Sequence, residues 1–107
     1  MKLIFLLPLT FFLLLSSVIS RADNDSDVRY SVSGYIKDSK NGEELIGAAV
    51  MVEGYQKGVV TNLYGFYSIS LISGNYILIF SYVGYEQKEV QITLDRNLGI
   101  NIELTEQ

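Results

Sequence analysis

Apolar and polar residues alternate along most of the chain beyond Tyr30, and turn-forming residues separate the alternating runs. Successive side chains of a strand point to opposite faces of a sheet, so a period of two predicts half-buried strands. The pattern predicts seven strands, over residues 31–37, 46–53, 58–61, 67–71, 76–80, 90–94 and 98–104. No helical period of any length is present beyond Tyr30, and Gly47 argues against a stable helical turn at 45–49.

Turn chemistry indicates where the chain reverses direction. Asn41-Gly42 is a strong reversal signal, and Ser73–Asn75 separates two apolar runs. Ahead of residues 67–71, we expect Asn62 and Gly65 to adopt the positive φ angles of a tight turn, because asparagine and glycine tolerate that conformation.

The alternation also predicts which side chains face the core. In each run one set of positions is mostly apolar, and we expect that set to be buried. It comprises Val32, Gly34, Ile36, Ile46, Ala48, Val50, Val52, Tyr67, Ile69, Leu71, Tyr76, Phe80, Val90, Ile92, Leu94, Leu98, Ile100, Ile102 and Leu104. So many short strands cannot pair as one flat sheet in a small domain, whereas two sheets packed face to face bury the apolar side of each strand. The sequence therefore predicts an all-β sandwich, with a small barrel as the alternative.

The first residues have the organisation of a secretory signal peptide. Lys2 provides a positive start, Leu3–Leu15 is almost entirely apolar, and small and polar residues follow. We expect residues 1–22 to be this signal, with cleavage after Ser20 or Ala22. The alternative is an uncleaved membrane anchor, but the apolar stretch is shorter than the roughly 20 residues of a spanning helix.

Residues 23–29 are polar and acidic, and we expect a flexible leader there, followed by one β-sandwich domain over residues 30–105. The chain has no cysteine, so neither disulfides nor a lipoprotein anchor can form, and a bacterial envelope protein fits this composition better than a small extracellular animal module. With 8 basic and 12 acidic side chains the chain is acidic, which argues against binding to nucleic acid or to an anionic membrane surface.

The sequence offers little catalytic chemistry. It contains no histidine to activate a serine or to bind zinc, and no lysine lies in an apolar setting that would lower its pKa. Glu43 and Glu44 are adjacent, so on a strand they would face opposite sides, and surface charge is the expected role. Residues 23–27 read D-N-D-S-D, like the start of a calcium loop, but the glycine and the bidentate acid of such a loop are missing. We expect no enzyme activity, no cofactor and no metal.

The tyrosines are the remaining candidates for a binding surface. Tyr67 and Tyr76 fall on alternating positions with apolar neighbours and are expected to pack in the core. Tyr35, Tyr55 and Tyr64 lie opposite a core face or in turns, so they can form an exposed contact patch, with structural and interface roles equally open.

Four segments resemble one known family. They are VSGYIKD at Val32–Asp38, GEELIGAAV at Gly42–Val50, TNLYGFYSI at Thr61–Ile69 and FSYVGYE at Phe80–Glu86. In this order they are similar to the carboxypeptidase regulatory-like domain, and the similarity covers nearly all of the chain beyond the leader. The resemblance implies a seven-stranded transthyretin-like or Ig-like β-sandwich. It is a resemblance to the accessory β-domain, not to the zinc peptidase domain.

In Bacteroidetes such a domain commonly follows the signal peptide of TonB-dependent outer-membrane receptors, including glycan importers, and precedes the plug and barrel. The resemblance thus implies an exported, non-catalytic interaction or structural module in the periplasm at the outer membrane. Its partners would be proteins, namely the receptor plug and barrel or other envelope components, and it would meet the membrane only through an attached receptor. Because the chain ends at Gln107, we expect a receptor fragment or truncated receptor. The alternative is a free-standing periplasmic β-sandwich that binds carbohydrate or peptide.

Overall fold

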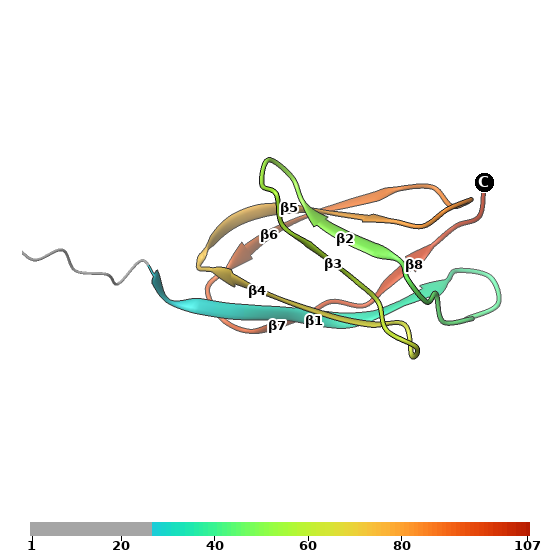
Figure 1. Ribbon diagram of the computed structural model, residues 1–107, viewed down its shortest axis with the longest axis horizontal. Helices are drawn as coiled ribbons and strands as arrows, with labels where there is room; N and C mark the ends of the chain where they lie inside the picture. The colour runs from blue at the N-terminus through green and yellow to red at the C-terminus, as the bar shows by residue number, and fades with distance from the viewer. Residues whose placement is uncertain (1–26) are drawn as a thin grey trace, which may run out of the picture.

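The computed structural model describes residues 27–107, which form an all-β sandwich of two stacked sheets (Figure 1). The strands are β1 (Arg29–Asp38), β2 (Ala49–Val52), β3 (Gly58–Val60), β4 (Phe66–Ile72), β5 (Gly74–Ser81), β6 (Lys88–Leu94), β7 (Leu98–Gly99) and β8 (Ile102–Leu104). The fold class expected from the alternation is confirmed. The predicted signal peptide and residues 23–26 of the predicted leader lie outside the described residues, whereas Arg29, expected in the leader, belongs to β1. No helix within residues 27–107 has the length and apolar character needed to cross a membrane.

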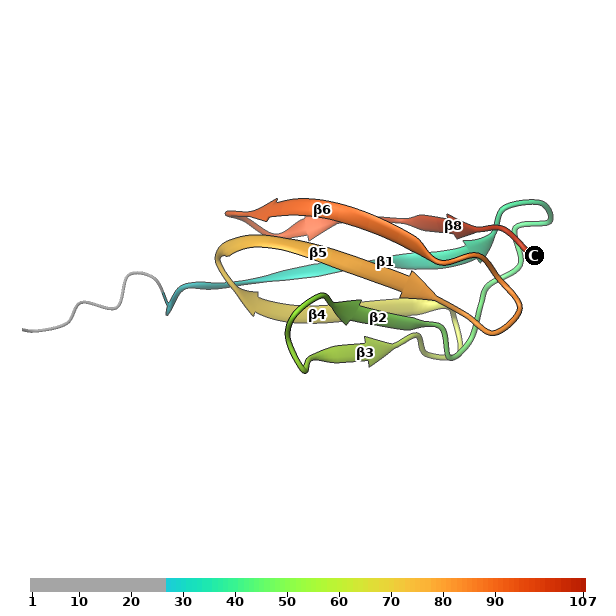
Figure 2. The same cartoon turned by 90° about the horizontal axis from the view of Figure 1, so that it is seen from above.

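Each sheet has four strands. One has the order β4-β1-β7, with β8 also paired to β1, and the other has the order β3-β2-β5-β6. Figure 2 looks onto the second sheet, where β3 forms one border and β6 forms the other. The sheets stay separate rather than closing, so the barrel alternative is wrong.

Eight strands occur instead of seven because the expected strand over 98–104 is divided. Both of its parts, β7 and β8, run parallel to β1. Between them the backbone of Ile100 lies so close to Gly34 that a Cβ atom at Gly34 would collide with the Ile100 carbonyl oxygen. Beside this contact the Tyr35 N–H donates a hydrogen bond to the side-chain Oδ1 of Asn101 at 2.9 Å, in place of a bond to a backbone carbonyl. Gly34 is therefore required by close backbone approach.

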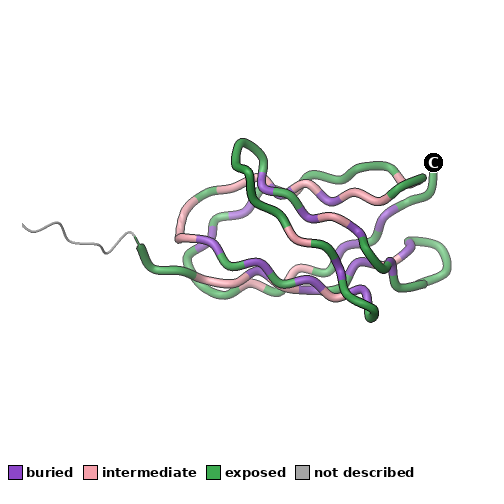
Figure 3. Tube along the Cα trace, in the orientation of Figure 1, coloured by how far each residue is buried: buried purple, intermediate pink, exposed green. Residues whose placement is uncertain are grey.

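The core lies between the sheets and follows the predicted alternation along the strands (Figure 3). Tyr67 and Phe80 are the largest fully buried side chains, and their rings meet edge to face at 5.7 Å. Tyr67 also donates a hydrogen bond from its hydroxyl to the Ile100 carbonyl at 2.7 Å, so its buried polar atom is satisfied. Burial raises the pKa of Tyr67 to about 12.

Two local expectations are wrong. Ile46 is exposed, because the chain bends at Gly47 (φ 83°) before β2 begins, and Leu45 takes the buried position instead. Asn62 does not adopt a positive φ angle, although Gly65 does, at 73°. The Asn62 side chain makes the turn instead, since its Oδ1 accepts hydrogen bonds from the backbone N–H groups of Tyr64 and Phe66 at 2.9 and 3.1 Å.

Candidate functional site

A hollow of about 540 Å³ lies beside the β2–β3 turn, over β5 and β6. The side chains that shape it include Glu53, Tyr55, Asn75, Tyr76, Gln91 and Thr93. We call it the Tyr55 hollow. Its volume falls within the range of about 300–1,000 Å³ that is usual for small-molecule sites.

The register of β5 and β6 brings the polar side chains of the hollow together. Asn75 pairs with Thr93 and Ile77 with Gln91, and these positions alternate with the core-facing residues of both strands. All four side chains therefore project from the outer face of the sheet. Glu53 joins them because its backbone N–H donates to the Ile77 carbonyl at 2.9 Å.

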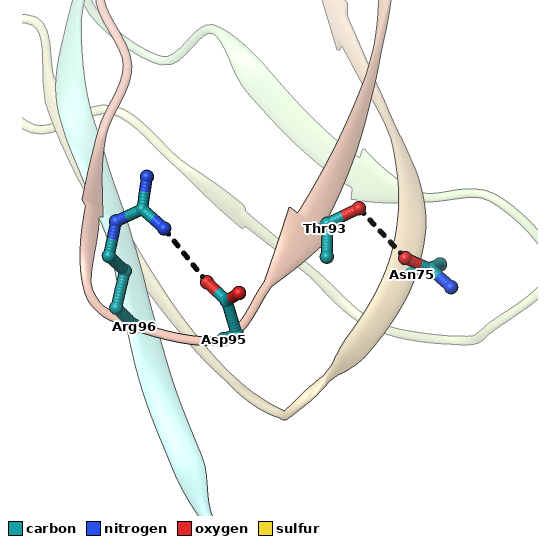
Figure 4. Close-up of polar contacts among 4 residues, drawn as sticks. All are labelled: Asn75, Thr93, Asp95 and Arg96. Carbon is teal, nitrogen blue, oxygen red and sulfur yellow. Dashed lines mark hydrogen bonds and ion pairs between the residues drawn. The ribbon is translucent and has the colours of Figure 1, made fainter.

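One polar contact orders the floor of the hollow. The Thr93 hydroxyl donates a hydrogen bond to Asn75 Oδ1 at 2.9 Å, and Figure 4 shows the amide nitrogen of Asn75 directed away from this contact.

In the turn that follows β6, Arg96 forms an ion pair with Asp95 at 3.0 Å (Figure 4). These two side chains are 73% and 65% exposed, so water screens the pair and it contributes little to stability.

The ring of Tyr55 forms one wall and is held by neighbouring contacts. Its centroid lies 5.6 Å from that of Tyr76 in an edge-to-face arrangement, and the Tyr76 hydroxyl donates to the Ile72 carbonyl at 2.6 Å. The Tyr55 N–H donates to the Val52 carbonyl at 3.1 Å, which fixes the turn. Even so, Tyr55 remains 58% exposed, so an aromatic surface is presented to solvent.

The three tyrosines expected to form one contact patch lie apart. Tyr55 is in the β2–β3 turn and Tyr64 in the β3–β4 turn, at opposite ends of β3. Tyr35 is on β1 in the other sheet, where its ring packs against Phe66 at 5.2 Å. Only Tyr55 lines the Tyr55 hollow. Tyr76, expected in the core, is partly buried and packs against the core, and its ring supports that of Tyr55.

Sequence reasoning missed the polar residues of the hollow, Glu53, Asn75, Gln91 and Thr93. Gln91 and Thr93 are visible in the sequence as the polar positions of the 90–94 run, but such positions normally mark a solvated face. Their meeting with Asn75 and Glu53 depends on strand register, which alternation alone does not specify.

A second polar cluster joins two turns at the end of the sandwich. The Asp38 carboxylate accepts hydrogen bonds from the Tyr85 hydroxyl at 2.7 Å and from the backbone N–H groups of Lys40 and Asn41 at 2.7 and 3.0 Å. The bond from Tyr85, with those from the backbone, lowers the pKa of Asp38 below its usual value. The bond to Asp38 raises the pKa of Tyr85 to about 12. A phenol with this pKa stays protonated at neutral pH, so the Tyr85 hydroxyl is suited to linking the two turns by a hydrogen bond rather than to acting as a nucleophile.

Thr61 is the other polar residue buried within residues 27–107. Its hydroxyl donates to the Leu45 carbonyl at 2.6 Å and accepts from the Ala48 N–H at 2.8 Å. Both bonds hold the bend ahead of β2, so this hydroxyl has a structural role. Within the same residues, no group of three or more histidine, cysteine or acidic side chains is arranged to hold a metal ion.

The free edge of β6 is the second surface that can bind a partner. The Glu53–Ile77 hydrogen bond shows that the backbone of Ile77 faces β2. Gln91 pairs with Ile77, so the N–H and C=O groups of Gln91 point away from β5, and those of Glu89 and Thr93 share that direction. Among residues 27–107 no hydrogen bond partner covers these groups.

The other edges are less available to a partner strand. On β4 the Phe66 N–H and C=O groups bond to Asn62, and the Ile72 carbonyl accepts the Tyr76 hydroxyl. β3 is only three residues long, and short edge strands are one way in which proteins avoid unwanted pairing. β6, with seven residues, is thus the longest edge in the described part of the chain that side chains leave uncovered.

Comparison with known proteins identifies similar domains. The CarboxypepD_reg-like domain family matches residues 32–107. Over 72 residues the chain is 38% identical to TonB-dependent receptor P26 of Formosa agariphila, covering 67% of this chain and 7% of the receptor. Over 68 residues it is 34% identical to TonB-dependent receptor SusC of Bacteroides thetaiotaomicron, covering 64% of this chain and 7% of the receptor. The chain thus spans a small part of the length of these receptors.

Solved structures share the fold. A DUF3823 family protein from Bacteroides ovatus superposes with a TM-score of 0.55 at 24% identity, over 74% of this chain and 45% of that one. Catechol 1,2-dioxygenase from Acinetobacter radioresistens superposes with a TM-score of 0.61 at 13% identity, over 78% of this chain and 53% of that one. At such low identity these similarities concern the fold alone.

Proposed function

Because the chain belongs to the carboxypeptidase regulatory-like domain family, we propose that it serves as a non-catalytic interaction module of a TonB-dependent outer-membrane receptor. The observation that carries the proposal is the match of this β-sandwich to receptors of two bacteria. Such receptors lie in the envelope, and we place the module on the periplasmic side of the outer membrane. Transport would be the work of receptor segments outside the matched region.

In this proposal the module binds its partner by accepting an additional strand at the β6 edge. A partner segment in extended conformation pairs with the outward N–H and C=O groups of Glu89, Gln91 and Thr93 and lengthens the sheet from four strands to five. Its apolar side chains pack beside Val90 and Ile92, which face the core side of β6. The partner is a segment of the receptor plug or barrel, or of another envelope protein.

The polar groups of the domain support a role without chemistry. Glu43 and Glu44 are exposed in the β1–β2 turn, and Asp38 is engaged in three hydrogen bonds. The pKa of Tyr85 at about 12 keeps its hydroxyl protonated. None of these groups combines a nucleophile with a base in the way that hydrolysis requires.

Proline substitution tests the edge. Glu89→Pro removes an N–H that points away from β5, so the β5–β6 hydrogen bonds remain, while an added strand loses a donor. Glu89→Ala is the matched control, since it removes the charge and keeps the N–H. We expect the full chain, tagged and expressed in the bacterium that encodes it, to co-purify with outer-membrane proteins, and Glu89→Pro to reduce the recovery at least tenfold. Equal recovery of both variants would exclude the β6 edge, and absence of outer-membrane proteins would refute the receptor module.

A further inference from the structure

The Tyr55 hollow offers hydrogen-bonding groups that its own contacts leave free. Because the Thr93 hydroxyl donates to Asn75 Oδ1, the two Nδ2–H donors of Asn75 and the acceptor capacity of the Thr93 oxygen remain unused. The side chains of Gln91 and Glu53 have no hydrogen bond to another residue within 27–107 and add one amide and one carboxylate. The hollow therefore offers both donors and acceptors.

This mixture of groups selects for one chemistry. A hydroxyl group both donates and accepts, so a ligand rich in hydroxyls can pair with the amides and the carboxylate without leaving either kind of group unsatisfied. No lysine or arginine lines the hollow, and the Glu53 carboxylate is its one charged side chain. An anionic ligand would therefore meet repulsion without a compensating cation.

The aromatic wall supplies the apolar half of the recognition. A sugar ring presents C–H groups on its faces and hydroxyls around its rim, so a flat aromatic surface beside polar side chains complements it. The Tyr55 ring is 58% exposed, yet it is positioned by Tyr76, which is itself tied to Ile72. Because the ring is already ordered, binding costs little conformational entropy.

We propose that the Tyr55 hollow binds an uncharged carbohydrate, with a sugar ring stacked on Tyr55 and its hydroxyls paired with Glu53, Asn75, Gln91 and Thr93. A peptide is the less favoured occupant, since an extended backbone pairs with the β6 edge rather than with side chains on the outer face of the sheet. This site is separate from the edge in the proposed function, and either can exist without the other.

The test is an NMR titration of the isotope-labelled full chain with single probes. These are uncharged hexasaccharides of glucose, mannose and xylose, a hexasaccharide of uronic acids, and a decapeptide of alternating apolar and polar residues. We expect at least one uncharged hexasaccharide to shift the amide signals of Asn75, Gln91 and Thr93, while the uronic acid probe shifts none of them.

Variants assign the binding to the hollow. Tyr55→Ala should weaken binding at least tenfold, and Thr93→Val several-fold, because the valine is similar in size but lacks the hydroxyl. Tyr64→Ala is the matched control, since Tyr64 is 67% exposed in a turn at the other end of β3 and should bind as the native chain does. Thermal unfolding of each variant confirms that it is folded.

Three results would overturn the proposal: no shift with any uncharged hexasaccharide, unchanged affinity after Tyr55→Ala, or shifts at the hollow with the uronic acid or peptide probe alone. Glu89→Pro should leave carbohydrate binding intact. Failure at the hollow therefore leaves the receptor module standing, and loss of envelope partners in Glu89→Pro leaves the hollow standing.

Discussion

Replacing Phe80 with alanine removes the ring at the centre of the sandwich. Phe80 has no exposed surface, and its ring meets that of Tyr67 at 5.7 Å. Phenylalanine-to-alanine changes in packed cores cost about 3–5 kcal/mol, because the transfer energy is lost and a cavity remains. The edge-to-face pair with Tyr67, worth about 0.5–1.5 kcal/mol, places the expected loss in the upper half of that range.

Such a loss is a large share of the stability of a small domain, which is typically about 5–15 kcal/mol. The free energy of unfolding can be measured by urea denaturation, followed by circular dichroism and tyrosine fluorescence, since the chain has no tryptophan. Phe66→Ala is the matched control. Phe66 is partly exposed on the outer face, where its ring packs against Tyr35, so its loss should cost about 0.5–1.5 kcal/mol.

Two outcomes would refute the reasoning. One is a loss below about 2 kcal/mol for Phe80→Ala, which would mean that the ring does not fill the core or that the core collapses around the gap. The other is an equal loss for Phe80→Ala and Phe66→Ala, which would mean that the faces of β4 and β5 are assigned wrongly.

Gly34→Ala should destabilise the domain by about 1–3 kcal/mol in urea denaturation, because its Cβ collides with the Ile100 carbonyl. Gly42→Ala is the comparison: it has open space around it but a φ of 73°, so it shows the cost of turn strain without a clash. The lowered pKa of Asp38 means that the unfolded state binds protons more readily, so this stabilisation is present above the unfolded pKa of about 3.9 and is lost as pH falls through the folded value. In Asp38→Asn, the free energy of unfolding, measured by urea denaturation at a series of pH values, should therefore fall less steeply as the pH is lowered through the acid range. The pKa of Tyr67 at about 12 means that stability present below pH 10 is lost as pH rises to 12, and Tyr67→Phe should reduce that loss in the same measurement.

Most of the fold could be predicted from alternation. The runs at 67–71 and 90–94 predict both strand and buried face correctly, because one side of each strand packs in the core. Ile46 was misassigned because alternation assumes a continuous strand, and the bend at Gly47 changes the phase before β2 begins. Asn62 was misassigned because asparagine can form a turn with its side chain as well as with its backbone.

The candidate site could be predicted only in part. The sequence predicts correctly that Tyr35, Tyr55 and Tyr64 are exposed. It does not predict that they lie apart, because residue type alone does not specify position in the fold. The polar floor of the hollow depends on the pairing of Asn75 with Thr93 across two strands. The free β6 edge depends on which backbone N–H and C=O groups face β5, and the pattern of side chains does not predict the direction of these groups.

Site-specific photo-crosslinking in growing cells tests the central claim, that this domain is a receptor module binding partners through β6. A photoreactive residue is placed at Glu89, on the free edge, or at Ser68, which is exposed on the other sheet. The account predicts that crosslinking from position 89 captures an outer-membrane receptor or another envelope protein and that position 68 captures none. Equal capture from both positions, or capture from neither, would contradict it.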